Sequence, residues 1–166
     1  MGNRHLTIAM LALCSWTMPA FAAADRIYCA ASDAAVNVTL ETGFSNKDEQ
    51  RLIHFRGMVA VMEKAVPPEF RRIELDSDML RQYWTDGRDL RFSLHAFSPT
   101  KSPVYRVTIS LVTNRKTDSD PRYDGNFRLA VQKLTSGSRV DGDSLFEHDV
   151  PIFCAIKRPV WPSQNL

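Results

Sequence analysis

The feature of this sequence that most constrains its fold is a recurring alternation of apolar and polar residues. Residues 36–40, 90–94, 105–111 and 123–131 all alternate in this way. Successive side chains of a β-strand point to opposite faces, so a period of two predicts strands with one buried and one exposed face. We therefore expect a mainly β fold.

Turn residues between these runs predict how the strands connect. Asp86-Gly87 stands between the short run 83–85 and the run 90–94. Asp and Gly tolerate the positive φ that both central residues of a type I′ turn require, so we expect a two-residue hairpin turn here. Residues 73–75 predict a further short strand, and residues 77–81 predict one helical turn.

The segment 46–66 fits two patterns. Leu52, Phe55 and Val59 fall at helical spacing, whereas Phe55, Gly57 and Val59 fit an alternating strand equally well. Gly57 and the β-branched residues around it disfavour a helix. We expect a strand and keep the helix as the alternative.

Cysteines set the second constraint. The chain has three, at positions 14, 29 and 154. Cys14 lies in an N-terminal segment that we expect to be removed, which leaves one cysteine near each end of the domain. In an oxidising compartment such a pair forms a disulfide, so Cys29 and Cys154 are predicted to join the first and last strands. Those strands then either neighbour each other or face each other across two sheets.

The first 22 residues have the features of a signal peptide. Arg4 and His5 form a short polar region, residues 6–18 are largely apolar, and Ala20-Phe21-Ala22 fits the small-x-small cleavage rule. A segment of thirteen residues spans about 20 Å as a helix, less than the roughly 30 Å of a hydrocarbon core. We expect cleavage near Ala22, no transmembrane anchor afterwards, and a periplasmic or secreted location.

The remaining chain has the size and composition of one globular domain. Hydrophobic residues make up 44% of the sequence and charged residues 24%. Removing residues 1–22 takes away one of 21 basic residues, Arg4, and none of the 19 acidic ones, so the net charge becomes +1. Lys and Arg form no continuous stripe, which argues against nucleic acid as a partner. We expect a single β-rich domain over 23–158 and a loose tail over 159–166.

Together these features predict an antiparallel β-sandwich or closed barrel in which one disulfide joins the first and last strands. The last strand is expected over 150–156, and Pro151 indicates a strand start or an edge strand. The pattern does not distinguish a sandwich from a barrel, and it gives no oligomeric state.

No catalytic, cofactor or metal motif is evident. The mature histidines, His54, His95 and His148, are far apart in sequence, with His148 expected in a polar turn, and no C-x-x-C, H-E-x-x-H or G-x-S-x-G pattern occurs. Aspartates gather around residues 118–124 and 141–143, where Asp and Gly are ordinary turn residues. We therefore name no catalytic, cofactor-binding or metal-binding residue.

One hairpin carries residue types that are common in interfaces. Tyr, Trp and Arg are enriched among residues that dominate binding energy. The candidate binding surface consists of Tyr83, Trp84, Arg88, Arg91 and His95. The competing interpretation is that one of the two aromatic residues covers the core, because consecutive strand residues point to opposite faces.

These observations favour a binding role over catalysis. We expect an exported, non-enzymatic domain that binds a protein, a glycan or a component of the cell envelope. The alternative is a small exported hydrolase whose carboxylate or histidine site is assembled only by the fold.

Overall fold

The computed structural model describes residues 25–45, 48–99, 103–138 and 141–157. The predicted signal peptide, Cys14 and the C-terminal tail from 159 to 166 lie outside these residues. Nine antiparallel strands form one sheet in the order β4-β3-β2-β1-β9-β8-β7-β6-β5. The fold is mainly β, as predicted.

The strands vary from five to 16 residues in length. They are β1 (Arg26–Ser32), β2 (Val36–Ser45), β3 (Asp48–Val61), β4 (Arg72–Asp76), β5 (Leu80–Thr85), β6 (Asp89–Phe97), β7 (Tyr105–Asn114), β8 (Arg122–Leu134) and β9 (Gly142–Lys157). Two short 3-10 helices, η1 (Pro68–Phe70) and η2 (Ser77–Met79), flank β4. The strand at 73–75 is confirmed. The helical turn predicted at 77–81 is a 3-10 turn over 77–79, because residues 80 and 81 begin β5.

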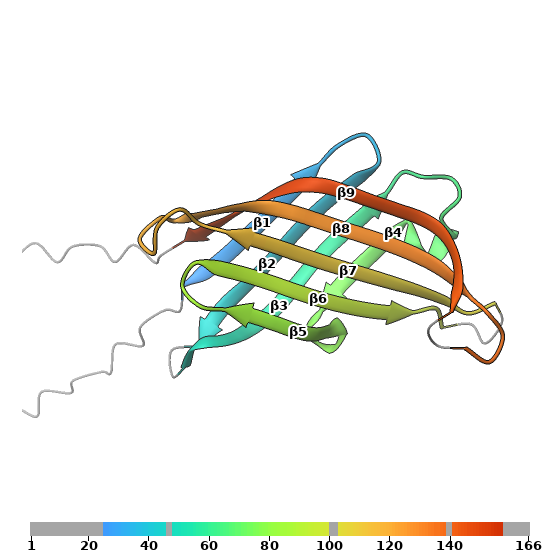
Figure 1. The fold of residues 1–166 in the computed structure, drawn as a ribbon, viewed down its shortest axis with the longest axis horizontal. Helices are drawn as coiled ribbons and strands as arrows, with labels where there is room; N and C mark the ends of the chain where they lie inside the picture. Colours follow the sequence, from blue (N-terminus) through green and yellow to red (C-terminus); the bar gives the residue numbers. More distant parts are fainter. Residues whose placement is uncertain (1–24, 46–47, 100–102, 139–140, 158–166) are drawn as a thin grey trace, which may run out of the picture.

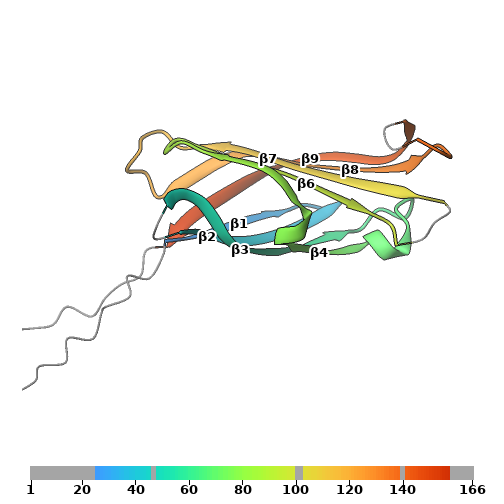
Figure 2. The same cartoon turned by 90° about the horizontal axis from the view of Figure 1, so that it is seen from below.

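The sheet folds back on itself into a nearly closed, flattened barrel. Strands β1 to β4 form one layer and β6 to β9 the other (Figure 2). β8 pairs with β9 from Gly142 to Ala155 and β1 pairs with it from Phe153 to Lys157, so β9 connects the two layers. The two edge strands, β4 and β5, are joined along the chain by η2. The architecture is therefore barrel-like, with a seam between β4 and β5.

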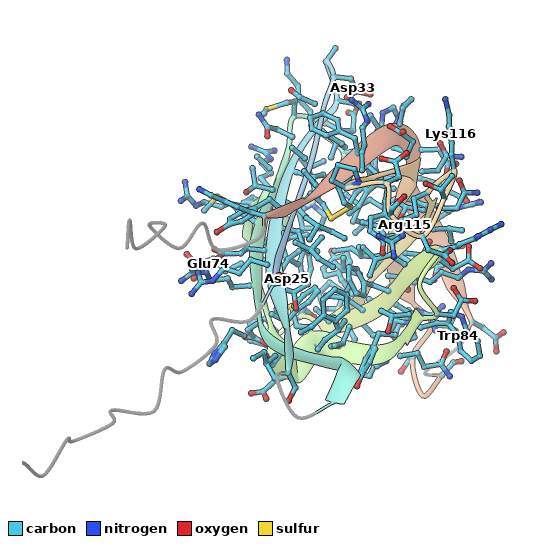
Figure 3. The ribbon with its side chains drawn as sticks, turned by 90° about the vertical axis from the view of Figure 1, so that its left-hand side faces the viewer. Asp25, Asp33, Glu74, Trp84, Arg115 and Lys116 are labelled. Atoms are coloured by element: carbon cyan, nitrogen blue, oxygen red, sulfur yellow. A yellow bond between two sulfur atoms is a disulfide. The ribbon has the colours of Figure 1, made fainter. Side chains whose placement is uncertain are left out.

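The core fills the space between the two layers (Figure 3). Alternate residues of β1 and β2, among them Ile27, Val36 and Val38, have no exposed surface, as the period of two requires. Phe55 of β3 meets Phe92 of β6 edge to face across the interior, with ring centroids 5.5 Å apart. This contact joins the two layers close to the seam.

Cys29 and Cys154 form the predicted disulfide. They are direct partners in the β1–β9 ladder, with Cα atoms 3.9 Å apart, and both are buried. The first and last strands are therefore neighbours in one sheet, and the bond lies on the inner face of the barrel (Figure 3).

The segment 46–66 contains strand β3, so the strand interpretation is confirmed and the helix is wrong. Gly57 shows why no larger residue stands there. A Cβ at this position would lie 2.4 Å from the backbone carbonyl oxygen of Thr39 on the neighbouring strand. The missing side chain lets β2 and β3 approach each other.

The predicted two-residue type I′ turn at Asp86-Gly87 is wrong. The connection between β5 and β6 has three residues, and of these only Gly87 has a positive φ, of 91°. The Asp86 carboxylate instead accepts hydrogen bonds from the backbone N–H groups of Arg88 and Asp89. This side-chain bonding stabilises a longer loop, which the Asp-Gly pair alone did not indicate.

The last strand begins at Gly142 and not at 150, so His148 lies within a strand and not in a turn. Pro151 lies well inside β9, contrary to the expectation that it starts the strand. The β1 ladder reaches only to Phe153, so at Pro151 the paired neighbour of β9 is β8 alone. A residue without an N–H is tolerated there because one edge of the strand is open.

Candidate functional site

The predicted binding surface on the β5–β6 hairpin is divided between two faces. Trp84 pairs with Arg91 on the outer face, and its side chain is 59% exposed. Tyr83 pairs with the buried Phe92, so it points to the inner face at the edge strand, where it remains 40% exposed. The two aromatic residues therefore cannot contact the same flat partner.

The three polar members of that surface are also dispersed. Arg88 lies in the loop and its guanidinium group pairs with Asp118. Arg91 pairs with Asp89 on its own strand. His95 is half-buried on the outer face, and its pKa is lowered mainly by burial and then by the charges of Arg106 and Arg81. The structure places Trp84, Arg91 and His95 on one face and leaves Tyr83 and Arg88 elsewhere.

A different outer surface, over β1, β9, β2 and β3, brings exposed apolar side chains together. A shallow hollow of about 540 Å³ crosses these strands. We call it the β1/β9 groove; the outward-facing residues that define it are Tyr28, Ala30, Thr39, Met58, Phe153 and Ala155. Tyr28 is 39% exposed and Phe153 46% exposed.

The groove is produced by an alternation of large and small residues across the two central strands. Tyr28 pairs with Ala155, and Ala30 pairs with Phe153. The aromatic rings therefore occupy two diagonal corners of a four-residue square, and the alanines occupy the other two. Small residues between large ones leave a hollow with aromatic walls.

The disulfide lies directly behind this square. Cys29 and Cys154 are the residues between these pairs, on the opposite face of the same strands. Arg122 of β8 covers part of the Phe153 ring, with its guanidinium carbon 4.9 Å from the ring centroid. The groove is therefore built on the two strands that are covalently joined, which limits how far its walls can move apart.

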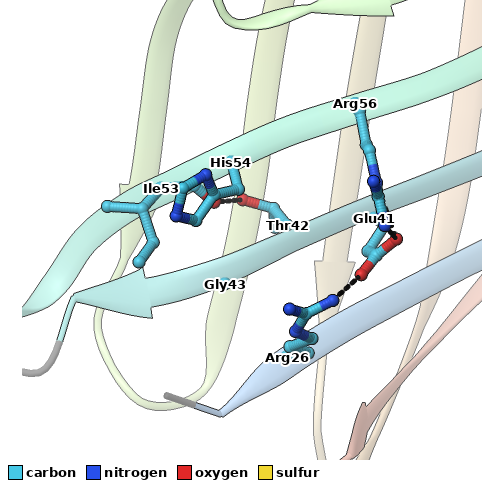
Figure 4. A pocket seen from close by; sticks show the side chains of 7 residues that line it. All are labelled: Arg26, Glu41, Thr42, Gly43, Ile53, His54 and Arg56. Carbon is cyan, nitrogen blue, oxygen red and sulfur yellow. Dashed lines mark hydrogen bonds and ion pairs between the residues drawn. The ribbon is translucent and has the colours of Figure 1, made fainter. Parts of the chain in front are cut away.

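A polar pocket of about 390 Å³ adjoins the groove (Figure 4). We call it the arginine pocket; its lining residues are Arg26, Glu41, Thr42, Gly43, Ile53, His54 and Arg56. Glu41 and Arg56 line both hollows, so the two are direct neighbours on the outer face.

Glu41 stands between two guanidinium groups. One Glu41 oxygen accepts a hydrogen bond from Arg26 at 2.6 Å, and the other accepts two from Arg56, at 2.8 and 2.5 Å (Figure 4). The pKa of Glu41 is lowered, mainly by the Arg56 hydrogen bonds, with smaller effects from Arg26 and Tyr28. The side chain of Tyr28, which lines the groove, therefore also interacts with Glu41 of the pocket.

A strand irregularity shapes the arginine pocket. The β2–β3 register shifts between Glu41 and Gly43, and His54 on the opposite strand has a φ of 54°. Such a left-handed conformation is uncommon outside glycine, although His adopts it more often than most residues. The hydroxyl of the buried Thr42 stabilises the irregularity by donating to the Ile53 carbonyl at 3.1 Å. A bulge of this kind widens the ladder and redirects side chains.

No family model, curated protein or solved structure matches this chain.

The best candidate for fold-assembled acid–base chemistry is a His–Asp pair at the opposite end of β1. His148 Nε2 lies 2.6 Å from an Asp33 carboxylate oxygen, and its ring stacks on Phe146. The other Asp33 oxygen accepts the backbone N–H groups of Ala35 and Val36. Neither His148 nor Asp33 lines the groove or the arginine pocket.

Among the described residues, no group of three or more His, Cys, Asp or Glu side chains is arranged to bind a metal ion. The aspartates around 118–124 contact arginines: Asp118 pairs with Arg88, and Asp124 pairs with Arg122.

None of the helices in the described part of the chain has the length and hydrophobicity needed to cross a bilayer. A disulfide is compatible with an extracellular or periplasmic location.

Sequence reasoning did not find the groove or the pocket, although the sequence contained a usable signal. Tyr28 and Phe153 each stand next to a cysteine of the predicted disulfide. Because strand residues alternate between faces, the neighbours of two buried cysteines point outward, and they share one face when the two strands are ladder partners. The arginine pocket had no such signal, because Arg26 and Arg56 meet only through Glu41 on a third strand.

Proposed function

We propose that this protein is an exported, non-enzymatic binding domain that recognises a segment of a partner protein through the β1/β9 groove. The observation that carries the proposal is the pair of exposed aromatic rings, Tyr28 and Phe153, set around two alanines over the disulfide. Exposed apolar residues gathered in one hollow are typical of an interaction site.

The shape and composition of the groove favour a protein over a small molecule. Pockets for small ligands usually bury most of the ligand, whereas this hollow is shallow and lies on a sheet face. Aromatic residues, Met and Arg are enriched in protein interfaces, and here Tyr28, Phe153, Met58, Arg56 and Arg122 border one surface. A chain segment lying along the sheet can add contacts on both sides of the groove.

The location follows from the N-terminal pattern together with the disulfide. In this proposal residues 1–22 direct export and are removed near Ala22, and the domain acts in the periplasm or outside the cell. The expected intact mass of the exported protein corresponds to a chain starting close to Ala23, without free thiols.

The experiment is a selection of displayed peptides on the oxidised, exported protein. Ala155→Gln fills the groove between the two aromatic rings with a neutral side chain. Val112→Gln places the same side chain on an exposed position of β7, in the other layer, as the matched control. We expect peptides whose binding falls at least about tenfold in Ala155→Gln, as for loss of an interface hot spot, and is unchanged in Val112→Gln.

Two results would contradict the proposal. One is that the enriched peptides bind Ala155→Gln as well as the native protein. The other is that a saccharide, and no peptide, binds in a way that Ala155→Gln abolishes. The alternative is a small exported hydrolase whose fold-assembled site would be the His148–Asp33 pair. We rank it second because neither residue lines the groove or the arginine pocket.

A further inference from the structure

The arginine pocket next to the groove has a charge of its own. Its lining residues include two arginines, Arg26 and Arg56, and one carboxylate, Glu41, so the ionised side chains sum to +1. The side chains of both arginines are more than half exposed, whereas that of Glu41 is 18% exposed. A ligand group that approaches from solvent therefore reaches the two guanidinium groups before it reaches the carboxylate.

Glu41 uses only part of the hydrogen-bonding capacity of the two arginines. A guanidinium group has five N–H donors, and Glu41 accepts from one nitrogen of Arg26 and two of Arg56. Glu41 neutralises one of the two positive charges and leaves N–H donors of both guanidinium groups unused by it. Two neighbouring guanidinium groups with such donors left over suit a second carboxylate.

Charged residues of both signs lie near the pocket and the groove. Glu74 of β4 is exposed and is the ladder partner of Met58, so it adds a carboxylate at the β3 side of the groove. Lys157 of β9 is the ladder partner of Arg26 and adds a cation at the same end of the sheet. Asp76 of β4 is the ladder partner of Arg56, but its carboxylate accepts the backbone N–H groups of Asp78 and Met79 at the start of η2.

We propose that the arginine pocket binds an acidic side chain, Asp or Glu, of the same partner segment whose apolar side chain occupies the β1/β9 groove. This inference rests on the proposed function, because it assigns a second contact to the same ligand. The preferred occupant is an acidic peptide segment with an apolar residue close to the acidic one.

The sheet geometry sets the spacing between the two groups. Glu41 lies one strand away from β1, and Arg56 lies two strands away. Neighbouring strands are about 4.8 Å apart, and an extended chain rises about 3.3 Å per residue, so the acidic residue falls about one to three positions from the apolar one. Both residues come from a single continuous segment.

The first test is the sequence pattern of the peptides selected on the native protein. We expect those that depend on the groove to carry Asp or Glu within about three positions of an apolar residue, following the strand spacing. Replacing that Glu by Gln in a synthetic peptide is expected to weaken binding at least about tenfold, as for loss of a charge-assisted hydrogen bond. Isothermal titration calorimetry measures both affinities.

Two protein variants with opposite expected effects complete the test. Arg26→Gln combined with Arg56→Gln is expected to abolish the difference between the Glu and Gln peptides. Glu41→Gln removes the competing carboxylate and raises the pocket charge to +2, so it is expected to strengthen binding of the Glu peptide several-fold and leave the Gln peptide unchanged. An increase in affinity cannot come from misfolding.

The outcomes separate this inference from the proposed function. Peptides that depend on the groove but lack an acidic residue overturn the inference and leave the proposed function standing. Equal affinity of the Glu and Gln peptides for the native protein, or no gain with Glu41→Gln, also overturns the inference. If the selected peptides bind Ala155→Gln as tightly as the native protein, the result overturns both this inference and the proposed function.

Discussion

The β1/β9 groove and the β5–β6 hairpin both expose aromatic residues, but only the groove gathers them on one face. In the hairpin, Tyr83 and Trp84 are consecutive and point to opposite faces of an edge strand. In the groove, Tyr28 and Phe153 are distant in sequence and share a face of two central strands. In Figure 3, Trp84 and Glu74 lie on opposite sides of the molecule, and Glu74 shares the layer of the groove.

The two regions also differ in how they are held. The groove lies over a disulfide in the middle of the sheet, whereas the hairpin ends at the seam, where β5 has β6 as its ladder partner. A binding surface gains affinity when its residues are fixed before the partner arrives. Residue types alone pointed to the hairpin; support from the surrounding structure favours the groove.

The largest expected effect comes from removing the support of the groove. Replacing Cys29 and Cys154 together by Ala is expected to lower the free energy of unfolding by about 5 kcal/mol, because the bond closes a loop of 125 residues. Urea unfolding of the oxidised protein and the double variant measures this loss. Hydrogen exchange is expected to increase more in β1 and β9 than in the hairpin. A loss below about 1 kcal/mol would contradict the account.

A pair of aromatic substitutions compares the two regions directly. Phe153→Ala is expected to weaken binding of a selected peptide more than about tenfold, as for a central interface residue. Trp84→Ala is expected to leave that affinity unchanged and to alter the free energy of unfolding by less than about 0.5 kcal/mol, because Trp84 is 59% exposed. Calorimetry and urea unfolding give these values. Unfolding of Trp84→Ala would show that the hairpin residue belongs to the core.

The smallest effect concerns the far end of β1, where Asp33 contacts His148. The hydrogen bond with His148, helped by the N–H groups of Val36 and Ala35, lowers the pKa of Asp33 from 3.8 to about 2. Because this pKa is lower in the folded protein, the stabilisation is present above pH 3.8 and is lost as the pH falls toward 2. The melting temperature of the native protein should therefore fall more between pH 5 and pH 2 than that of Asp33→Asn.

Equal losses in the two proteins would mean that this contact does not stabilise the folded state. The contacts that hold β1 against β9 would then be the disulfide and the backbone hydrogen bonds of the ladder.

Much of the fold could be predicted because the relevant signals are local. Alternation over 36–40, 105–111 and 123–131 gave strands with the correct buried faces, and the count of cysteines gave the disulfide. The turn at Asp86-Gly87 was wrong because the Asp86 side chain bonds to two backbone N–H groups and stabilises a longer loop.

The candidate site could not be predicted in the same way because it depends on register. Which residue opposes Tyr28 is decided by the β1–β9 ladder, and the contact of Arg26 with Arg56 passes through Glu41 on the strand between them. Neither follows from the residues of one strand. If Cys29 and Cys154 had been assumed to be direct ladder partners, the disulfide would have predicted which residue opposes Tyr28.

The most direct test of the groove as the binding site is a nuclear magnetic resonance titration of the oxidised, uniformly ¹⁵N-labelled protein with a selected peptide. The account predicts that the largest amide shift changes fall on β1, on β9 around Phe153 and Ala155, and on β3 around Arg56. Changes concentrated on the hairpin from Leu80 to Phe97, with β1 and β9 unaffected, would contradict it.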